Sequence, residues 1–410
     1  MKLASRVERI EPFWVMEMAK SAREVAAGAA CDPARGGEPM IYLNIGEPDF
    51  TASAPVQAAA QACLQAGHTA YTQATGLPAL RSAISAWYAQ RFGLDIAPER
   101  ILVTAGASAA LQLVCLALFE AGDEVLMPDP CYPCNRHFVT AAGGQARLLP
   151  CGPEQRFQLD AAGVEAAWTP ATRGVVLASP SNPTGTSIDP AEMGRIVEAV
   201  RERGGVTVVD EIYLGLSYEA RFGRSALALP GALGESVISI NSFSKYFSMT
   251  GWRLGWLVVP PALVPVIERL AQNLFICPSA VAQHAALACF EPDSLAEFER
   301  RREQFKARRD YFLPELERLG LHVPVRPDGA FYAYADASAA IERLGLPVGQ
   351  SDGTGGSWDL AFALMERARV VVTPGRDFGQ AQPAQHIRFS TASSMAQLQE
   401  AIARLEAVLA

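Results

Sequence analysis

Lysine is rare in this chain, and one lysine directly follows an apolar segment. The 410 residues include 35 basic side chains, and all of these except positions 2, 20, 245 and 306 are arginines. Lys245 follows the apolar run 237–240, which indicates a buried strand. Burial or a neighbouring cation lowers the pKa of a lysine from its usual value of about 10.4. The setting of Lys245 therefore suits an amine nucleophile.

A carboxylate ends another apolar segment, 35 residues before this lysine. Asp210 follows residues 206–209, and an unpaired buried carboxylate is costly in free energy. It therefore needs a cationic partner, and a protonated ring nitrogen would serve. Arg253 brings a permanent positive charge close to Ser242 and Ser244. This group suits a phosphate.

Small residues open a predicted helix after the apolar segment 101–104. They are Gly106, Ala107 and Ser108. Backbone N–H groups at a helix N-terminus form an anion site, and the pattern therefore predicts a second contribution to phosphate binding.

Short apolar strands alternate with amphipathic helices from about residue 100, which is typical of an α/β fold with a largely parallel sheet. Ligands bind outside the carboxyl ends of the strands in such sheets. Polar or aromatic residues follow five of the predicted strands in succession, so we expect them along one edge. The strands are predicted at 101–104, 124–127, 174–178, 206–209, 237–240 and 254–259, with helices at 109–120 and 190–203.

The last third of the chain has a different pattern, which predicts a second, smaller α+β part. The expected large domain covers 46–290, and the small domain combines 1–45 with 291–410. A helix is expected near the N-terminus at 12–27. Further helices are predicted at 295–319, 359–369 and 394–409, with an exposed strand at 329–335 and another strand at 386–390.

Composition argues against several classes of function. The net charge is −8, which disfavours a nucleic-acid partner. Neither a signal peptide nor a run of about twenty apolar residues is found, so we expect a cytoplasmic protein without a membrane partner. Cys131 and Cys134 form a C-x-x-C pair, but no second pair follows at a spacing that zinc requires. We therefore expect ordinary reduced thiols and no metal.

Several motifs together resemble the signature blocks of the class I/II aminotransferases, the fold-type-I pyridoxal-phosphate enzymes. The blocks are SPSNPTG at 179–185, VDEIY at 209–213, SFSK at 242–245 and MTGWRLG at 249–255. Further matches are NIGEPDF at 44–50, Tyr71-Thr72 followed by Gly76-Leu77, and IRFS at 387–390. The resemblance covers nearly the whole chain.

The resemblance implies pyridoxal 5′-phosphate as cofactor, held by Lys245 as an aldimine, and a ping-pong exchange of an amino group between an L-amino acid and a 2-oxo acid. Asp210 would keep the pyridine nitrogen protonated. The other implied cofactor contacts are Asn182 and Tyr213 at the ring hydroxyl, Tyr132 on the ring face, and Gly106, Ala107, Ser108, Ser242, Ser244 and Arg253 at the phosphate.

Substrate contacts and a partner are also implied. Arg388 would bind the α-carboxylate in a bidentate fork, with Gly46 and Asn182 beside it. Tyr71 would reach the phosphate of a neighbouring subunit, which makes a homodimer the working unit.

Two alternatives to a transaminase stay open, and a third is excluded. A C–S β-lyase or a cyclopropane-forming synthase would use the same lysine, aspartate and arginine with a different fate for the carbanion. A pyridoxal-phosphate-binding sensor domain of a transcription regulator fits less well, because fewer than 50 residues precede Gly46. Ser242 and Lys245 also match S-x-x-K of penicillin-recognising hydrolases, but a K-T-G partner is absent.

The side chain of the substrate is expected to be apolar, with glutamate still open as an amino donor if Arg388 or another group adapts to it. Dicarboxylate-specific relatives place a second cation near the distal carboxylate, and the stretch between Arg269 and Arg300 contains none. Phe13, Trp14 and Phe275 are expected to make the pocket apolar, which favours alanine-like, branched or aromatic amino acids.

Overall fold

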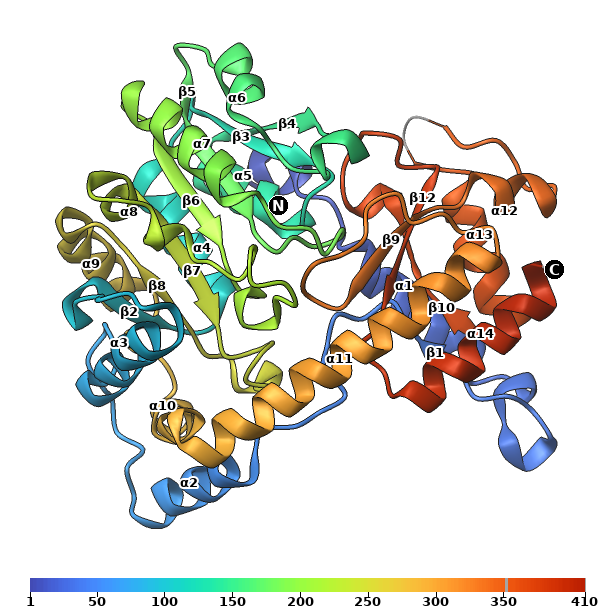
Figure 1. The fold of residues 1–410 in the computed structure, drawn as a ribbon, viewed down its shortest axis with the longest axis horizontal. Helices are drawn as coiled ribbons and strands as arrows, with labels where there is room; N and C mark the ends of the chain where they lie inside the picture. The colour runs from blue at the N-terminus through green and yellow to red at the C-terminus, as the bar shows by residue number, and fades with distance from the viewer. Residues whose placement is uncertain (351–352, 410) are drawn as a thin grey trace.

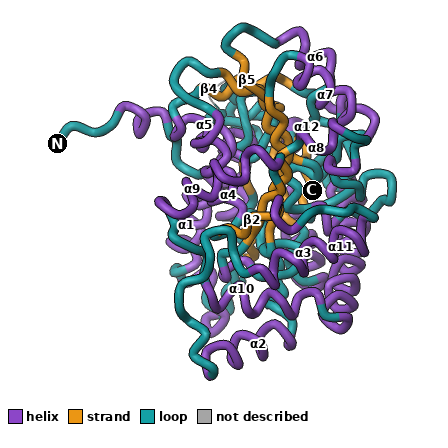
Figure 2. The backbone as a smooth tube through the Cα atoms, turned by 90° about the vertical axis from the view of Figure 1, so that its left-hand side faces the viewer, coloured by secondary structure: helices purple, strands orange, loops and turns teal. Residues whose placement is uncertain are grey.

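A seven-stranded sheet between two layers of helices forms the larger part of the computed structural model, which describes residues 1–350 and 353–409 (Figures 1 and 2). The strand order is β2-β8-β7-β6-β5-β3-β4. β8 runs antiparallel to both neighbours, and the other adjacent strands are parallel. The strands are β2 (Ile101–Thr104), β3 (Glu124–Asp129), β4 (Gln145–Pro150), β5 (Thr172–Ala178), β6 (Val206–Asp210), β7 (Ile238–Ser242) and β8 (Gly255–Val258).

Helices cover both faces of this sheet because its strands are apolar on both sides, as in β2 and β6. One hydrophobic cluster joins the sheet to α4 (Ala107–Leu118), α5 (Pro133–Ala142) and α9 (Val264–Leu274). Another joins it to α3 (Pro78–Phe92), α6 (Ala161–Ala167), α7 (Pro190–Glu202) and α10 (Ala280–Leu287). α2 (Ala54–Gln65) packs on α10, and the short α8 (Ala232–Ser236) on α7.

Smaller sheets form a second part with its own hydrophobic cluster. Its antiparallel sheet has the order β11-β12-β9, and β1 pairs with β10 in parallel. The strands are β1 (Ile41–Tyr42), β9 (Tyr332–Asp336), β10 (Val370–Val371), β11 (Thr373–Pro374) and β12 (His386–Ser390). The helices are α1 (Trp14–Ala26), α12 (Ser338–Arg343), α13 (Ser357–Ala363) and α14 (Met395–Leu409).

The long helix α11 (Pro292–Arg318) connects the two parts (Figure 1). Phe298 and Phe305 belong to the cluster under the large sheet, whereas Phe312 and Leu316 belong to the cluster of the second part. The division into 46–290 and the remaining segments stays a prediction.

The strands and helices expected from the sequence are confirmed within a few residues. Several further elements were not predicted, among them the edge strand β4 with its polar residues and Pro150. A strand is present close to the one expected at 329–335, but its expected exposure is wrong, since β9 is buried over nearly its whole length. Among the described helices, none combines the length and the apolar character needed to span a membrane.

Candidate active site

A cavity of about 240 Å³ lies at the carboxyl edge of the large sheet, facing β9 and β12 of the second part. Twelve of the fourteen residues predicted for the site line it. They are Gly46, Ala107, Ser108, Tyr132, Asn182, Asp210, Tyr213, Ser242, Ser244, Lys245, Arg253 and Arg388. The carboxyl ends of the sheet strands supply many of them, and β12 and the segment at Gly46 supply Arg388 and Gly46, which are 342 positions apart in the sequence.

Lys245 lies in the turn after β7 and its amine faces the cavity. Nζ donates a hydrogen bond to the backbone oxygen of Gly46 at 2.6 Å. Burial lowers the pKa of Lys245 to about 8, and the positive charges of Arg388 and Arg253 act in the same direction. Glu47 and Asp210 oppose the shift. A substantial fraction of the amine is therefore neutral near pH 8, as a nucleophile or base requires.

Asp210 is the last residue of β6, and its carboxylate is almost completely buried. It accepts a hydrogen bond from the Ile212 amide at 3.1 Å. Burial raises its pKa to about 7, while this hydrogen bond and Lys245 lower it. The cationic partner predicted from the sequence is not supplied by an ion pair within the described residues. The site thus favours a bound cation beside Asp210.

Three tyrosines surround the centre of the cavity. The hydroxyls of Tyr213 and Tyr332 are hydrogen-bonded at 2.7 Å. Tyr132 packs edge-on against Phe13, with ring centroids 5.9 Å apart. Tyr332 is the first residue of β9 and was not predicted as a site residue, because that strand was expected to be exposed.

Arg388 is buried in β12, the central strand of its sheet. It donates to the side-chain oxygen of Asn182 at 2.7 Å and also to the backbone oxygen of Asn44. Its guanidinium lies 4.5 Å from the ring centroid of Tyr332 and 5.0 Å from that of Phe378. Nε has no hydrogen-bond partner within the described residues. A buried guanidinium of this kind can bind a carboxylate through two parallel hydrogen bonds.

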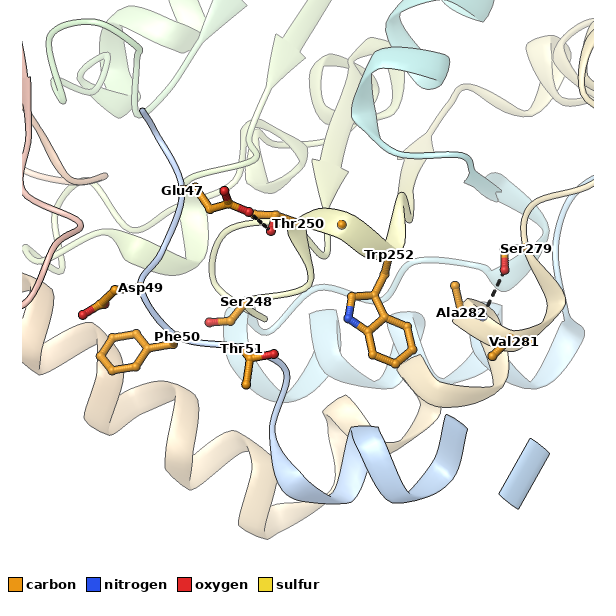
Figure 3. A pocket seen from close by; sticks show the side chains of 11 residues that line it. Glu47, Asp49, Phe50, Thr51, Ser248, Thr250, Trp252, Ser279, Val281 and Ala282 are labelled. Carbon is orange, nitrogen blue, oxygen red and sulfur yellow. Dashed lines mark hydrogen bonds between the residues drawn. The ribbon is translucent and has the colours of Figure 1, made fainter. Parts of the chain in front are cut away.

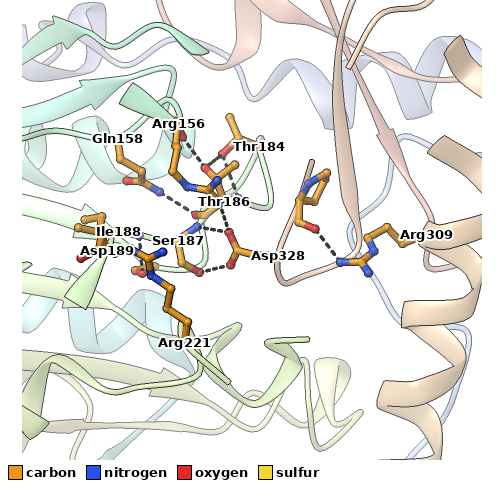
Figure 4. Close-up of polar contacts among 12 residues, drawn as sticks. Arg156, Gln158, Thr184, Thr186, Ser187, Ile188, Asp189, Arg221, Arg309 and Asp328 are labelled. Atoms are coloured by element: carbon orange, nitrogen blue, oxygen red, sulfur yellow. Dashed lines mark hydrogen bonds and ion pairs between the residues drawn. The ribbon is translucent and has the colours of Figure 1, made fainter. Parts of the chain in front are cut away.

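The loop that carries Asn182 is fixed to the segment before β9 (Figure 4). Asp328 accepts hydrogen bonds from the amide and the hydroxyl of Ser187 and forms an ion pair with Arg156. The Gly185 oxygen accepts from the Asp328 amide at 2.9 Å. These contacts fix the position of the loop that carries Asn182 relative to β9, which carries Tyr332.

The other end of the cavity collects anion-binding groups. Ala107 and Ser108 open α4, and the Ser244 amide donates to the Ser242 hydroxyl at 3.0 Å. Gly106 itself does not line the cavity, but a Cβ at this position, whose φ is +84°, would lie 2.6 Å from Nη2 of Arg253. Glycine therefore lets the arginine approach the helix terminus.

This donor set fits pyridoxal phosphate. A helix terminus, two hydroxyls and an arginine suit the phosphate, and Asp210 suits the protonated ring nitrogen. Tyr132 adds an aromatic ring to the cavity lining.

Several predicted residues lie outside the cavity. Tyr71 is 82% exposed, and Trp14 packs against Trp358. Phe275 packs on the cluster around α4 and α9. Of the three aromatics expected to make the pocket apolar, only Phe13 is among the described residues that line it.

The first turn of α1 forms an apolar wall that the sequence did not fully predict. Phe13, Val15 and Met16 line the cavity. The carboxylate of Asp377 accepts hydrogen bonds from the amides of Trp14 and Val15, at 3.0 and 3.3 Å. Asp377 therefore caps α1 from a distant part of the chain, and no local capping signal could have revealed it.

Comparisons with known proteins identify the family of the chain. The family model described as "Aminotransferase class I and II" matches residues 38–405. A valine–pyruvate aminotransferase of Mycobacterium tuberculosis is 36% identical over 97% of this chain and 96% of its own length. An aspartate aminotransferase of Geobacillus stearothermophilus is 32% identical, over 99% of this chain and 98% of its own.

A solved structure shows the same fold. The aspartate aminotransferase of Thermus thermophilus with maleate has a TM-score of 0.86 and 32% identity, and the match covers all of both chains. The protein therefore belongs to the class I and II aminotransferases. It is a pyridoxal-phosphate-dependent transaminase of amino acids.

Proposed function

We propose that this transaminase moves the amino group between an amino acid with an apolar side chain and a small 2-oxo acid such as pyruvate. The observation that carries the proposal is the single cavity in which Lys245, Asp210 and Arg388 meet an apolar wall. The relative named as a valine–pyruvate aminotransferase supports the same substrate class.

The apolar wall decides the side-chain preference. Phe13, Val15, Met16 and Ile45 line the cavity, and its basic lining residues are Lys245, Arg253 and Arg388. We assign Arg253 to the phosphate of the cofactor and Arg388 to the α-carboxylate of the substrate. Within the described lining, no further cation remains for a distal carboxylate. Burying an unpaired carboxylate is costly, so an apolar side chain is preferred.

Each reactive residue has a role that follows from its surroundings. When bound, pyridoxal phosphate supplies an electron-withdrawing ring that stabilises negative charge at the substrate α-carbon. Asp210 would keep the ring nitrogen protonated, and its burial would strengthen this ion pair. Nζ of Lys245 would hold the cofactor and would accept the α-proton of the substrate. Arg388 and Asn182 orient the α-carboxylate.

We further propose that a second copy of the chain completes the phosphate end. Ser108 and Arg253 are exposed in the single chain, and so is the ring of Tyr71. A groove of about 640 Å³ lies next to Arg253, which donates a hydrogen bond to the Thr250 oxygen; Glu47, Thr250, Trp252 and neighbouring residues line it (Figure 3). The proposed homodimer would cover this face and bring Tyr71 to the phosphate of the partner. Light scattering of the holoenzyme tests the homodimer, and a monomeric holoenzyme would contradict it.

The cytoplasmic location stays a prediction.

A panel of amino donors and acceptors tests the substrate class. We expect valine, alanine and similar donors to react with pyruvate at much higher kcat/KM than aspartate. Reaction of aspartate and oxaloacetate alone would overturn the proposal. Incubation with the amino acid alone gives a second readout, because a transaminase converts its cofactor once whereas a lyase releases ammonia continuously.

A further inference from the structure

Two buried tyrosines share a hydrogen bond at the inner end of the cavity. Tyr213 follows β6 and Tyr332 begins β9, so the pair joins the large sheet to the second part. Their hydroxyl oxygens are 2.7 Å apart, and each side chain is only 3% exposed. The rings meet edge-on, with centroids 5.6 Å apart. This burial excludes bulk water from the bond.

Tyr332 also contacts two other groups that face the reaction. Its hydroxyl lies 1.9 Å from the place where a Cβ of Gly46 would stand, so it fills the space that this glycine leaves free. The Gly46 oxygen is the acceptor of Lys245. The ring of Tyr332 faces the guanidinium of Arg388 at 4.5 Å. Its hydroxyl is therefore held in place from several sides.

The number of protons in this pair limits what Tyr213 can do. Each phenol has one proton to donate. If Tyr213 donated to Tyr332, it would have no proton left for an oxygen of the cofactor ring. Among the described residues, Tyr213 is the one hydrogen-bond partner of the Tyr332 hydroxyl. If Tyr332 donates its proton to Tyr213, the proton of Tyr213 is free to donate to the cofactor, and both phenol protons are used.

We propose that Tyr332 is a positioning residue that donates its hydroxyl proton to Tyr213 and thereby directs the Tyr213 proton to the ring oxygen of the cofactor. The inference rests on the proposed role of Tyr213 in the transaminase site. A hydroxyl that accepts one hydrogen bond becomes a stronger donor in the next. Tyr332 thus favours the deprotonated state of the bound cofactor.

Titration of the visible absorption of the bound cofactor tests this relay. The proteins are the wild-type holoenzyme, Tyr332→Phe, Tyr213→Phe and the double variant. We expect Tyr332→Phe to raise the pH midpoint by about half a unit, since it removes one neutral hydrogen bond. Tyr213→Phe should raise it further, and the double variant should match Tyr213→Phe because Tyr332 acts through Tyr213.

A matched control lies on the same strand. Tyr334 is buried in β9 but packs on His386 outside the cavity, so Tyr334→Phe should leave the midpoint unchanged. An unchanged midpoint in Tyr332→Phe, or shifts of the two tyrosine variants that simply add, would overturn the relay while leaving the transaminase assignment intact. A visible cofactor band that persists in the Lys245→Ala variant would instead contradict the proposed site.

Discussion

At the inner end of the cavity Asp210, Tyr213 and Asn182 are buried, and their partners come from the same chain. At the phosphate end, Ser108 and Arg253 face solvent beside an open groove. One chain therefore builds the reactive end completely and leaves the anchoring end open. If the proposed homodimer forms, substitutions at the inner end should act within each subunit, whereas those at the outer end should depend on the partner.

The largest expected effect at the inner end comes from Asp210→Asn. The amide cannot balance the positive ring nitrogen, and breaking a buried ion pair costs about 4 kcal/mol, or roughly a thousandfold in kcat. Steady-state kinetics with saturating cofactor measures it. Asp210→Glu, which keeps the charge, should retain more activity. Equal activity of the wild type and Asp210→Asn would show that this carboxylate does not act on the ring.

The raised pKa of Asp210 also predicts a pH-dependent stability. Burial raises this pKa from 3.8 to about 7, so between these values the folded chain holds a proton that the unfolded chain has released. The cofactor-free chain therefore loses stability as pH rises through this window. A bound cation offsets the loss. The gain in Tm on cofactor binding should increase toward pH 7 in the wild type and stay constant in Asp210→Asn. A wild-type gain independent of pH would contradict this.

Arg388→Leu should raise KM for amino acids about a hundredfold, because charge-assisted hydrogen bonds to the substrate carboxylate are lost. Arg388→Lys should recover only part of the loss, since a point charge cannot form the bidentate fork. Arg326 is an exposed arginine paired with Asp310, and Arg326→Leu serves as the control. An unchanged KM in Arg388→Leu would place the carboxylate elsewhere.

At the open end, Tyr71→Phe should weaken cofactor binding about tenfold through loss of one hydrogen bond to a charged group. Equilibrium dialysis measures this, with Tyr311→Phe as the control, because Tyr311 is a partly buried tyrosine of the second part that does not line the cavity. Mixed dimers of Tyr71→Phe and Lys245→Ala should regain one site of wild-type affinity, because one site then has both native residues. Failure to regain it would mean that Tyr71 does not act across the interface.

The smallest effect is expected from Asp377→Ala. Loss of the α1 cap is worth about 1 kcal/mol, which corresponds to a threefold to fivefold higher KM for apolar substrates. Asp377→Asn keeps a capping oxygen and should have a smaller effect. Kinetics with valine tests both variants. A change in cofactor binding instead of KM would show that the α1 wall is not a substrate contact.

Sequence patterns revealed the parts of the site that follow strands of the large sheet. Lys245, Asp210 and Asn182 could be predicted because parallel strands end at one edge. Tyr332 and Asp377 could not, since their contacts join segments 119 and more than 360 residues apart. The strand at β9 was expected to be exposed, but side chains on both of its faces are buried. The alanines pack in the core of the second part, whereas Tyr332 faces the cavity.

The central claim is that Lys245 holds the cofactor, and the rarity of lysine makes it directly testable. Borohydride reduction of the holoenzyme, followed by proteolysis and mass spectrometry, locates the linkage among positions 2, 20, 245 and 306. We expect the cofactor on the peptide that contains Lys245, and no linkage in Lys245→Ala. A reduced linkage at another lysine, or one retained in that variant, would contradict the account.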